Sequence, residues 1–169
     1  MSPGGHAITT GVASAVAVCV HPSLPLAIGI VVGGFLIDVD HAVDYVLVDR
    51  QTDLRPSAFL RYYLEGRPRR VVLALHSYEL FAILIALAWW LHSSLLWGYA
   101  LGGLMHLALD IRFNGELLPD NVLAFYSFGY RAARRFRGGA LHGERPRAAA
   151  PESFWRAFFT GGRSGARNP

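Results

Sequence analysis

Histidine and acidic residues occur in this chain at helical spacing. His76 and Glu79 are three residues apart, and His106 and Asp110 are four apart, so each pair shares one face of a helix. Imidazole and carboxylate groups that project inward from facing helices bind divalent cations such as zinc, manganese or iron. The two pairs therefore predict a metal site inside a helical bundle.

A third polar group directly follows an apolar segment and consists of Asp38, Asp40 and His41. We expect Asp40 and His41 to bind the metal directly with His76 and His106. Asp38 is expected either to bridge a second ion or to orient an imidazole by accepting its hydrogen bond. The complete set of predicted metal ligands is His6, Asp38, Asp40, His41, His76, His106 and Asp110.

Two carboxylates are candidates for proton transfer in catalysis. Glu79 is the predicted general base, because a carboxylate beside an activated water can accept its proton. Asp110 is the second predicted catalytic residue, and like Asp38 it could bridge two ions or orient an imidazole. Arg69 and Arg70 could hold a substrate phosphate, although anchoring the loop at the membrane is the simpler explanation.

Each polar group also has a purely structural explanation. Either helical pair could be a hydrogen-bonded pair that only stabilises packing. Acidic residues after an apolar segment could simply mark its end, which is the simpler explanation for Asp44 and Asp49. His21, His92 and His142 have no acidic partner at helical spacing, and we assign them no role. The gathering of all the other groups at one membrane level is what favours a metal site.

The apolar segments that must position these groups are long and uncharged. Residues 1–37 and 80–109 contain no Asp, Glu, Lys or Arg, and mean hydropathy is +0.31. Such segments predict membrane spans, although the first two are shorter than the roughly 20 residues that a bilayer needs. The predicted fold is an all-α, polytopic membrane helix bundle. Its four expected spans are residues 7–20, 24–37, 71–91 and 95–111.

Arginine distribution predicts the orientation of these spans. All 16 basic residues are Arg, and they lie in the loop 38–70 or follow residue 111, whereas the turns 21–25 and 92–94 have none. Short loops rich in Arg stay in the cytoplasm. We therefore expect a multi-pass protein of the inner (plasma) membrane, with both termini and the loop 38–70 cytoplasmic. Because the Arg residues flank apolar segments, membrane topology explains them better than nucleic-acid binding does.

The chain divides into two predicted regions. Residues 1–130 form a membrane-embedded helical domain, and residues 131–169 form an Arg-rich cytoplasmic tail. Within the tail, the aromatic residues of segment 151–160 predict an amphipathic helix lying on the membrane, and the Gly/Arg-rich residues 161–169 are expected to be disordered. The single cysteine, Cys19, excludes a disulfide framework and a thiolate metal cage.

The order of these motifs resembles a known family. Asp38-x-Asp40-His41 after a Gly-rich segment, His76-Ser77, and His106-x-x-x-Asp110 resemble the LexA-regulated, membrane-bound family of metal-dependent hydrolases. The resemblance spans roughly residues 6–114 and implies a bacterial inner-membrane hydrolase. The family usually carries a His-Arg pair and a Thr ahead of His-Ser. Here Val71, Val72 and Leu75 occupy those places, and Glu79 could substitute for the missing group.

The predicted function is metal-dependent hydrolysis of an ester or phosphoester at the cytoplasmic membrane face, with a membrane lipid as one substrate class. Zinc is the first choice of metal, with manganese or iron as alternatives. A transporter of protons or metal ions, or a non-catalytic membrane scaffold, remains open as an alternative function. The glycine pairs at 33–34 and 102–103 permit close helix approach, either within the chain or between chains, so the oligomeric state stays open.

Overall fold

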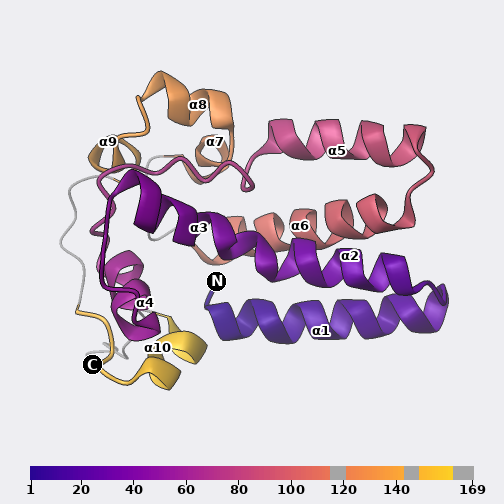
Figure 1. The fold of residues 1–169 in the computed structure, drawn as a ribbon, viewed down its shortest axis with the longest axis horizontal. Helices are drawn as coiled ribbons and strands as arrows, with labels where there is room; N and C mark the ends of the chain where they lie inside the picture. The colour runs from indigo at the N-terminus through magenta and orange to yellow at the C-terminus, as the bar shows by residue number, and fades with distance from the viewer. Residues whose placement is uncertain (115–120, 143–148, 162–169) are drawn as a thin grey trace.

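A computed structural model describes residues 1–114, 121–142 and 149–161, and the regular elements in these ranges are all helical. Four helices form an elongated bundle, and shorter helices gather at one of its ends (Figure 1). The all-α prediction is confirmed. The arginines at 145 and 147 and the predicted disorder of residues 162–169 lie outside the described residues.

The short elements are η1 (Leu36–Asp38), α3 (Val39–Val43), η2 (Asp44–Val48), α4 (Pro56–Leu64), α7 (Val122–Phe125), α8 (Phe128–Ala133), α9 (Gly138–His142) and α10 (Phe154–Thr160).

Two helical hairpins make the bundle. The first joins α1 (Pro3–Val20) to α2 (Leu24–Gly34), and the second joins α5 (Tyr78–Trp90) to α6 (Ser94–Phe113). Serine side chains at 2, 23, 77 and 93 accept a hydrogen bond from the first turn of each helix, which explains where all four helices begin. Both hairpin turns lie at the same end of the bundle.

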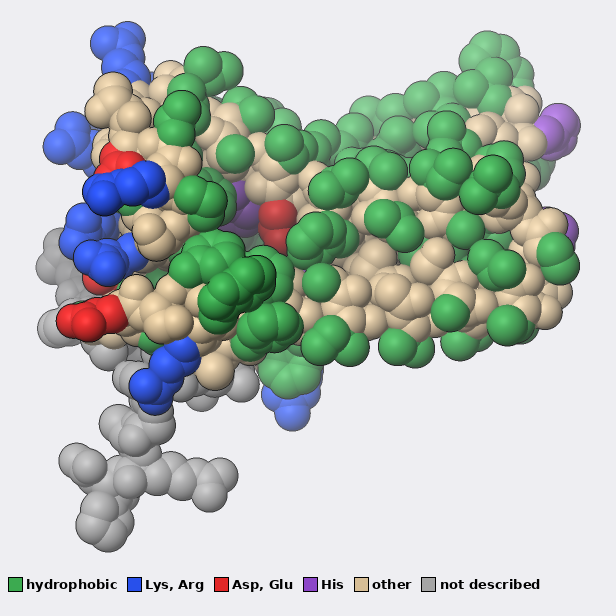
Figure 2. Space-filling model, turned by 60° about the horizontal axis from the view of Figure 1, so that its bottom comes forward, with side chains coloured by type: hydrophobic (Ala, Val, Ile, Leu, Met, Phe, Trp, Pro, Cys, Tyr) green, Lys and Arg blue, Asp and Glu red, His purple; other side chains and the backbone are tan. Residues whose placement is uncertain are grey.

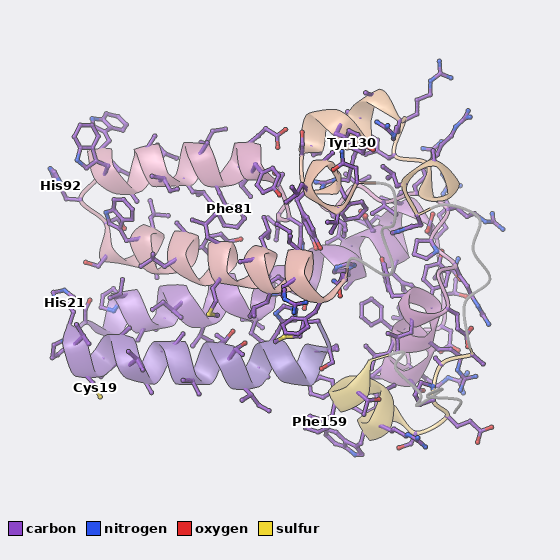
Figure 3. The ribbon with its side chains drawn as sticks, turned by 180° about the vertical axis from the view of Figure 1, so that it is seen from behind. Cys19, His21, Phe81, His92, Tyr130 and Phe159 are labelled. Atoms are coloured by element: carbon purple, nitrogen blue, oxygen red, sulfur yellow. The ribbon has the colours of Figure 1, made fainter. Side chains whose placement is uncertain are left out.

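Figure 3 marks this end by His21 and His92, which lie far from Tyr130 and Phe159 at the other end. Neither histidine joins a cluster of potential metal ligands among the described residues.

Helices α2 and α6 are in direct backbone contact. A Cβ atom added at Gly33 would lie 2.1 Å from the carbonyl oxygen of Tyr99, and one at Gly98 would lie 2.2 Å from that of Leu26. No real side chain fits at these distances, so only glycine permits this approach. The glycine contact that the sequence left unassigned therefore occurs within one chain, and it places α6 close beside the end of α2.

The candidate membrane spans are fewer than the four predicted. Helices α1 and α6 are long and apolar enough to cross a membrane, and α2 with Leu36–Val48 forms a third candidate bent by 46°. Helix α5 has only 13 residues, a length of about 20 Å, which is short for a bilayer. The four-span prediction is thus met only in part, because residues 71–77 do not continue α5 as expected.

Polar and apolar surfaces are separated along the bundle. Figure 2 shows hydrophobic side chains covering the half of the molecule that contains the two hairpin turns, whereas the Arg side chains gather toward the opposite end. The buried core extends to the polar end, where Leu107 of α6 packs with Val71, Phe125 and Leu141. Residues of the predicted tail therefore belong to the same core as the bundle.

Candidate metal centre

The fold brings all seven predicted ligands into one cluster at the junction of the apolar and charged halves. His6 comes from α1, His106 and Asp110 from α6, and His76 from the segment just before α5. The remaining three residues come from η1 and α3, which follow α2. Three overlapping groups have ligand atoms within 4.8 Å of one another, and they are His6, His106 and Asp110; Asp38, His76 and His106; and Asp40, His41 and His76.

The central group is an almost equilateral triangle of potential ligand atoms. The Nε2 atoms of His76 and His106 are 3.2 Å apart, and each lies 3.4 Å from Oδ1 of Asp38. Both imidazoles are buried, whereas the Asp38 side chain keeps 33% of its surface exposed. The triangle therefore has two fixed corners inside the protein and one corner that faces outward.

Hydrogen bonds on the far side of each ring orient the two histidines. Nδ1 of His106 lies 2.9 Å from the carbonyl oxygen of Gly34, which can only accept, so this nitrogen carries the proton. Nδ1 of His76 lies 3.1 Å from Oδ2 of Asp40, and this carboxylate also favours a proton there. With both Nδ1 atoms donating, the neutral rings would present Nε2 lone pairs toward each other, as in carboxylate–histidine–metal arrangements.

These three atoms fit a divalent cation. Zinc bonds of about 2.0–2.1 Å in tetrahedral geometry place ligand atoms about 3.3–3.4 Å apart, which matches the edges of the triangle. Two imidazole lone pairs and a carboxylate oxygen repel one another unless a positive charge lies between them. Three facing ligands also leave a fourth coordination position for water or substrate.

The structure reverses the expected roles of the two neighbouring aspartates. Asp40, predicted as a direct ligand, accepts hydrogen bonds from His76 Nδ1 and from the backbone N–H of Leu75. Asp38 instead approaches the histidines directly, including His41 Nε2 at 3.6 Å. Asp40 is therefore placed to orient His76, and Asp38 is placed to bind.

His6, the weakest candidate in the sequence, is fully part of the cluster. Its ring stacks on that of His106, with centroids 3.7 Å apart, and its Nε2 lies 3.0 Å from Oδ1 of Asp110. The other Asp110 oxygen is 3.4 Å from Nε2 of His106. Asp110 thus connects His6 to the central triangle, as a second-ion ligand or as a proton acceptor beside it.

Glu79 does not lie where the predicted general base should be. Its exposed carboxylate accepts hydrogen bonds from the Ser127 hydroxyl at 2.7 Å and from the backbone N–H groups of Phe128 and Gly129. These groups form the N-terminus of α8, so Glu79 caps that helix. The prediction assumed that His76 and Glu79 share a helix, but the helix begins at Tyr78 and the two side chains diverge.

Carboxylates hold the segment that carries His76 in an extended conformation. Asp44 and Asp49, expected only to end a span, accept hydrogen bonds from this segment across 20 residues or more. These bonds use the backbone N–H groups that a helix would need, which explains why residues 71–77 are not helical. The bonds join Asp49 to the N–H groups of Arg69 and Arg70, Asp44 to those of Val72 and Leu73, and Asp40 to that of Leu75.

Arg131 holds the same segment from its carbonyl side. Its guanidinium is fully buried and donates to the carbonyl oxygens of Val72, Leu73 and His76, and also to that of Phe125. No role is predicted for this residue from the sequence, because 55 positions separate it from His76. Arg131 therefore fixes the backbone that positions one of the central imidazoles.

A cavity of about 520 Å³ opens beside the cluster. His6, Asp38, His41, His76 and Asp110 line one wall, whereas α4 and α10 contribute mainly apolar side chains to the opposite wall. Tyr63 of α4 donates a hydrogen bond of 2.6 Å to the carbonyl of His41 and so connects the two walls. Burial raises the pKa of the Tyr63 phenol, which therefore stays protonated as a donor.

No family model, no curated protein and no solved structure matches this chain. The family resemblance thus depends on the ordered motifs alone, and the function has to be argued from the geometry of the cluster.

Proposed function

We propose that this protein is a membrane-bound, metal-dependent hydrolase that cleaves an ester or phosphoester at the membrane surface. One observation carries the proposal. Two histidine Nε2 atoms and a carboxylate oxygen converge at 3.2–3.4 Å beside a cavity large enough for a substrate.

In this proposal, the direct ligands are Asp38, His76 and His106. A divalent cation held there would supply Lewis acidity, activating water near neutral pH and polarising the substrate oxygen. Asp110 takes the role of proton acceptor, because its carboxylate lines the cavity and lies next to His106. His6 orients Asp110 through their hydrogen bond, and Asp40 keeps the His76 ring in place.

Zinc is the metal that the donor set fits best. Two imidazoles and one carboxylate are typical of catalytic zinc sites with an open position, and the triangle edges match tetrahedral bonds. Manganese and iron accept the same donors and are the alternatives. Asp110 and His6 provide ligand atoms for a second ion beside the first.

The proposed location is the inner membrane of a bacterium, with α1, the bent α2 segment, the short α5 and α6 all running across it and both termini in the cytoplasm. The Arg residues near the cluster support this orientation, since positive charge favours the cytoplasmic side. The motifs shared with the LexA-regulated hydrolases support the same location and the same activity.

A transporter is the main alternative, and the distribution of polar groups argues against it. A transport path needs polar groups through the full membrane depth. In the described outer half of the bundle, Ser14 bonds only to a helix backbone carbonyl and the surrounding side chains are mostly apolar. A non-catalytic scaffold is the other alternative, but it has no need of converging lone pairs beside a cavity.

The proposal is tested by hydrolysis of 4-nitrophenyl butyrate and bis(4-nitrophenyl) phosphate by zinc-loaded protein in detergent. We expect one substrate to be cleaved, and Asp38→Asn to lower kcat/KM by about 100-fold. Asp53→Asn is the matched control, because among the described residues the Asp53 side chain pairs only with the exposed Arg55. Cleavage of neither substrate, or equal loss in both variants, would contradict the proposal.

A further inference from the structure

The cavity beside the cluster has an amphipathic lining. Its histidine and acidic wall belongs to the bundle, while Phe59 and Leu60 of α4 and Phe154 and Phe158 of α10 lie on the apolar wall. A ligand that fills this space must place a polar, reactive group against the cluster and a hydrocarbon portion against the aromatic wall.

The described lining contains no arginine, and its terminal ammonium, that of Met1, pairs with Asp110 at 2.7 Å. A phosphate group needs cationic or bidentate donors, for which arginine is the usual residue. The arginines at positions 50, 69 and 70 lie around a separate surface hollow with Asp49. The lining of the main cavity therefore favours an uncharged carboxylic ester with an apolar tail over a phosphate monoester.

The cavity continues onto the apolar outer surface of the bundle. Leu36 and Val39 both line the cavity, yet they keep 51% and 55% of their surface exposed, and the partly exposed Asp38 lies between them. Figure 2 shows histidine and acidic side chains in the hollow between the charged end and the hydrophobic belt. A hydrocarbon chain could thus pass sideways from the membrane into the cavity without crossing water.

The helix α10 that covers the cavity also suits a membrane surface. It packs against α1 and α4 through its inner face, but Trp155 and Phe159 on its other side are 65% and 53% exposed. Exposed aromatic residues of this kind lie at the level of lipid headgroups, which is also the depth of the ester groups of membrane lipids.

We infer that the cavity binds an acyl chain of a membrane lipid and presents its carboxylic ester to the cluster. This inference rests on the proposed hydrolase function. Hydrolysis would add water across the ester: its oxygen bonds to the carbonyl carbon, the bond to the alcohol oxygen breaks, and the alcohol leaves with a proton. Asp110 accepts one proton from the attacking water and passes it to the leaving alcohol oxygen, and the fatty acid loses the remaining proton to solvent and is released as its carboxylate.

Photo-crosslinking tests this inference without requiring activity. The protein is placed in phosphatidylcholine vesicles that carry a diazirine on one acyl chain, with EDTA present, and labelled peptides are identified by mass spectrometry. We expect labels on the cavity-lining residues Leu60 of α4 and Phe154 and Phe158 of α10, as well as on the outer bundle surface. Leu60→Trp, which fills the cavity, should reduce the α4 and α10 labels by about tenfold. Leu54→Trp is the control, because Leu54 is 69% exposed and does not line the cavity.

The outcomes separate the two proposals. Labels confined to the outer bundle surface, or equal labelling in both variants, would overturn the acyl-chain site even if a short ester is cleaved. Labelling of the cavity without hydrolysis of any 4-nitrophenyl ester by zinc-loaded protein would uphold the lipid site but reject the hydrolase. Preference for 4-nitrophenyl octanoate over the acetate and over 4-nitrophenyl phosphate supports both. If Leu60→Trp does not fold, Leu64→Phe at the same wall replaces it.

Discussion

Different interactions stabilise two regions of the molecule, the α2–α6 contact and the extended segment before α5. Between α2 and α6, glycines allow backbone to touch backbone, and shape alone determines the contact. In the second region, carboxylates and Arg131 hold the extended segment before α5 by hydrogen bonds to its N–H and carbonyl groups. The α2–α6 contact determines where His106 lies along the bundle, beside Gly34. The hydrogen bonds to the extended segment determine the position of His76. The geometry of the candidate metal site therefore depends on both.

The glycine contact should be the more sensitive of the two regions. We expect Gly33→Leu to destabilise the protein by about 3 kcal/mol or more, because its side chain would overlap the backbone at Tyr99. Thermal unfolding in detergent, followed by circular dichroism, measures this change. Gly11→Leu is the matched control, since a Cβ atom at Gly11 meets nothing within 4 Å. Similar melting of both variants would show that the α2–α6 contact does not set the fold.

The hydrogen-bonded region should respond next. Arg131→Met leaves buried carbonyl oxygens unpaired, and we expect a loss of about 2 kcal/mol in stability. Zinc affinity should fall about tenfold, because His76 loses its backbone support. Isothermal titration measures the affinity, and Arg131→Lys should restore it only in part, since Lys lacks the guanidinium fork. The exposed Arg135→Met serves as control, and zinc affinity unchanged in Arg131→Met would refute the positioning role.

The smallest effect is expected at Glu79. Removing the charge by Glu79→Gln should weaken the α8 cap by about 1 kcal/mol and change kcat by less than about twofold. Initial rates of hydrolysis at saturating substrate concentration measure kcat. A general base would instead contribute about 100-fold or more to kcat. A loss of that size in Glu79→Gln would show that Glu79 acts as the general base, which the position of its carboxylate argues against.

The candidate ligands could be predicted because polar side chains are costly within apolar segments and therefore stand out. His106 and Asp110 share a helix face, and their expected proximity is confirmed. The roles of Asp38 and Asp40 could not be assigned, because residues two apart in a short turn of helix diverge and only the tertiary structure decides which faces the histidines.

Two misassigned features involve the start of α5. Ser77 is a standard N-cap residue, and it signals that the helix begins after His76. The predicted third span began at residue 71 instead. This start made the span too long and placed His76 and Glu79 on one helix face. The partners that keep residues 69–76 extended are distant in sequence, and Arg131 gives no local sign of its contacts.

Metal content tests the central claim most directly. Protein purified in detergent is analysed by plasma mass spectrometry as wild type, His76→Ala, His106→Ala and His92→Ala, the last altering the histidine at the opposite end of the bundle. We predict a stoichiometric divalent metal in the wild type and in His92→Ala, and its loss in the other two variants. Absence of metal from all four proteins after reconstitution with zinc or manganese, or retention in His76→Ala and His106→Ala, would contradict the account.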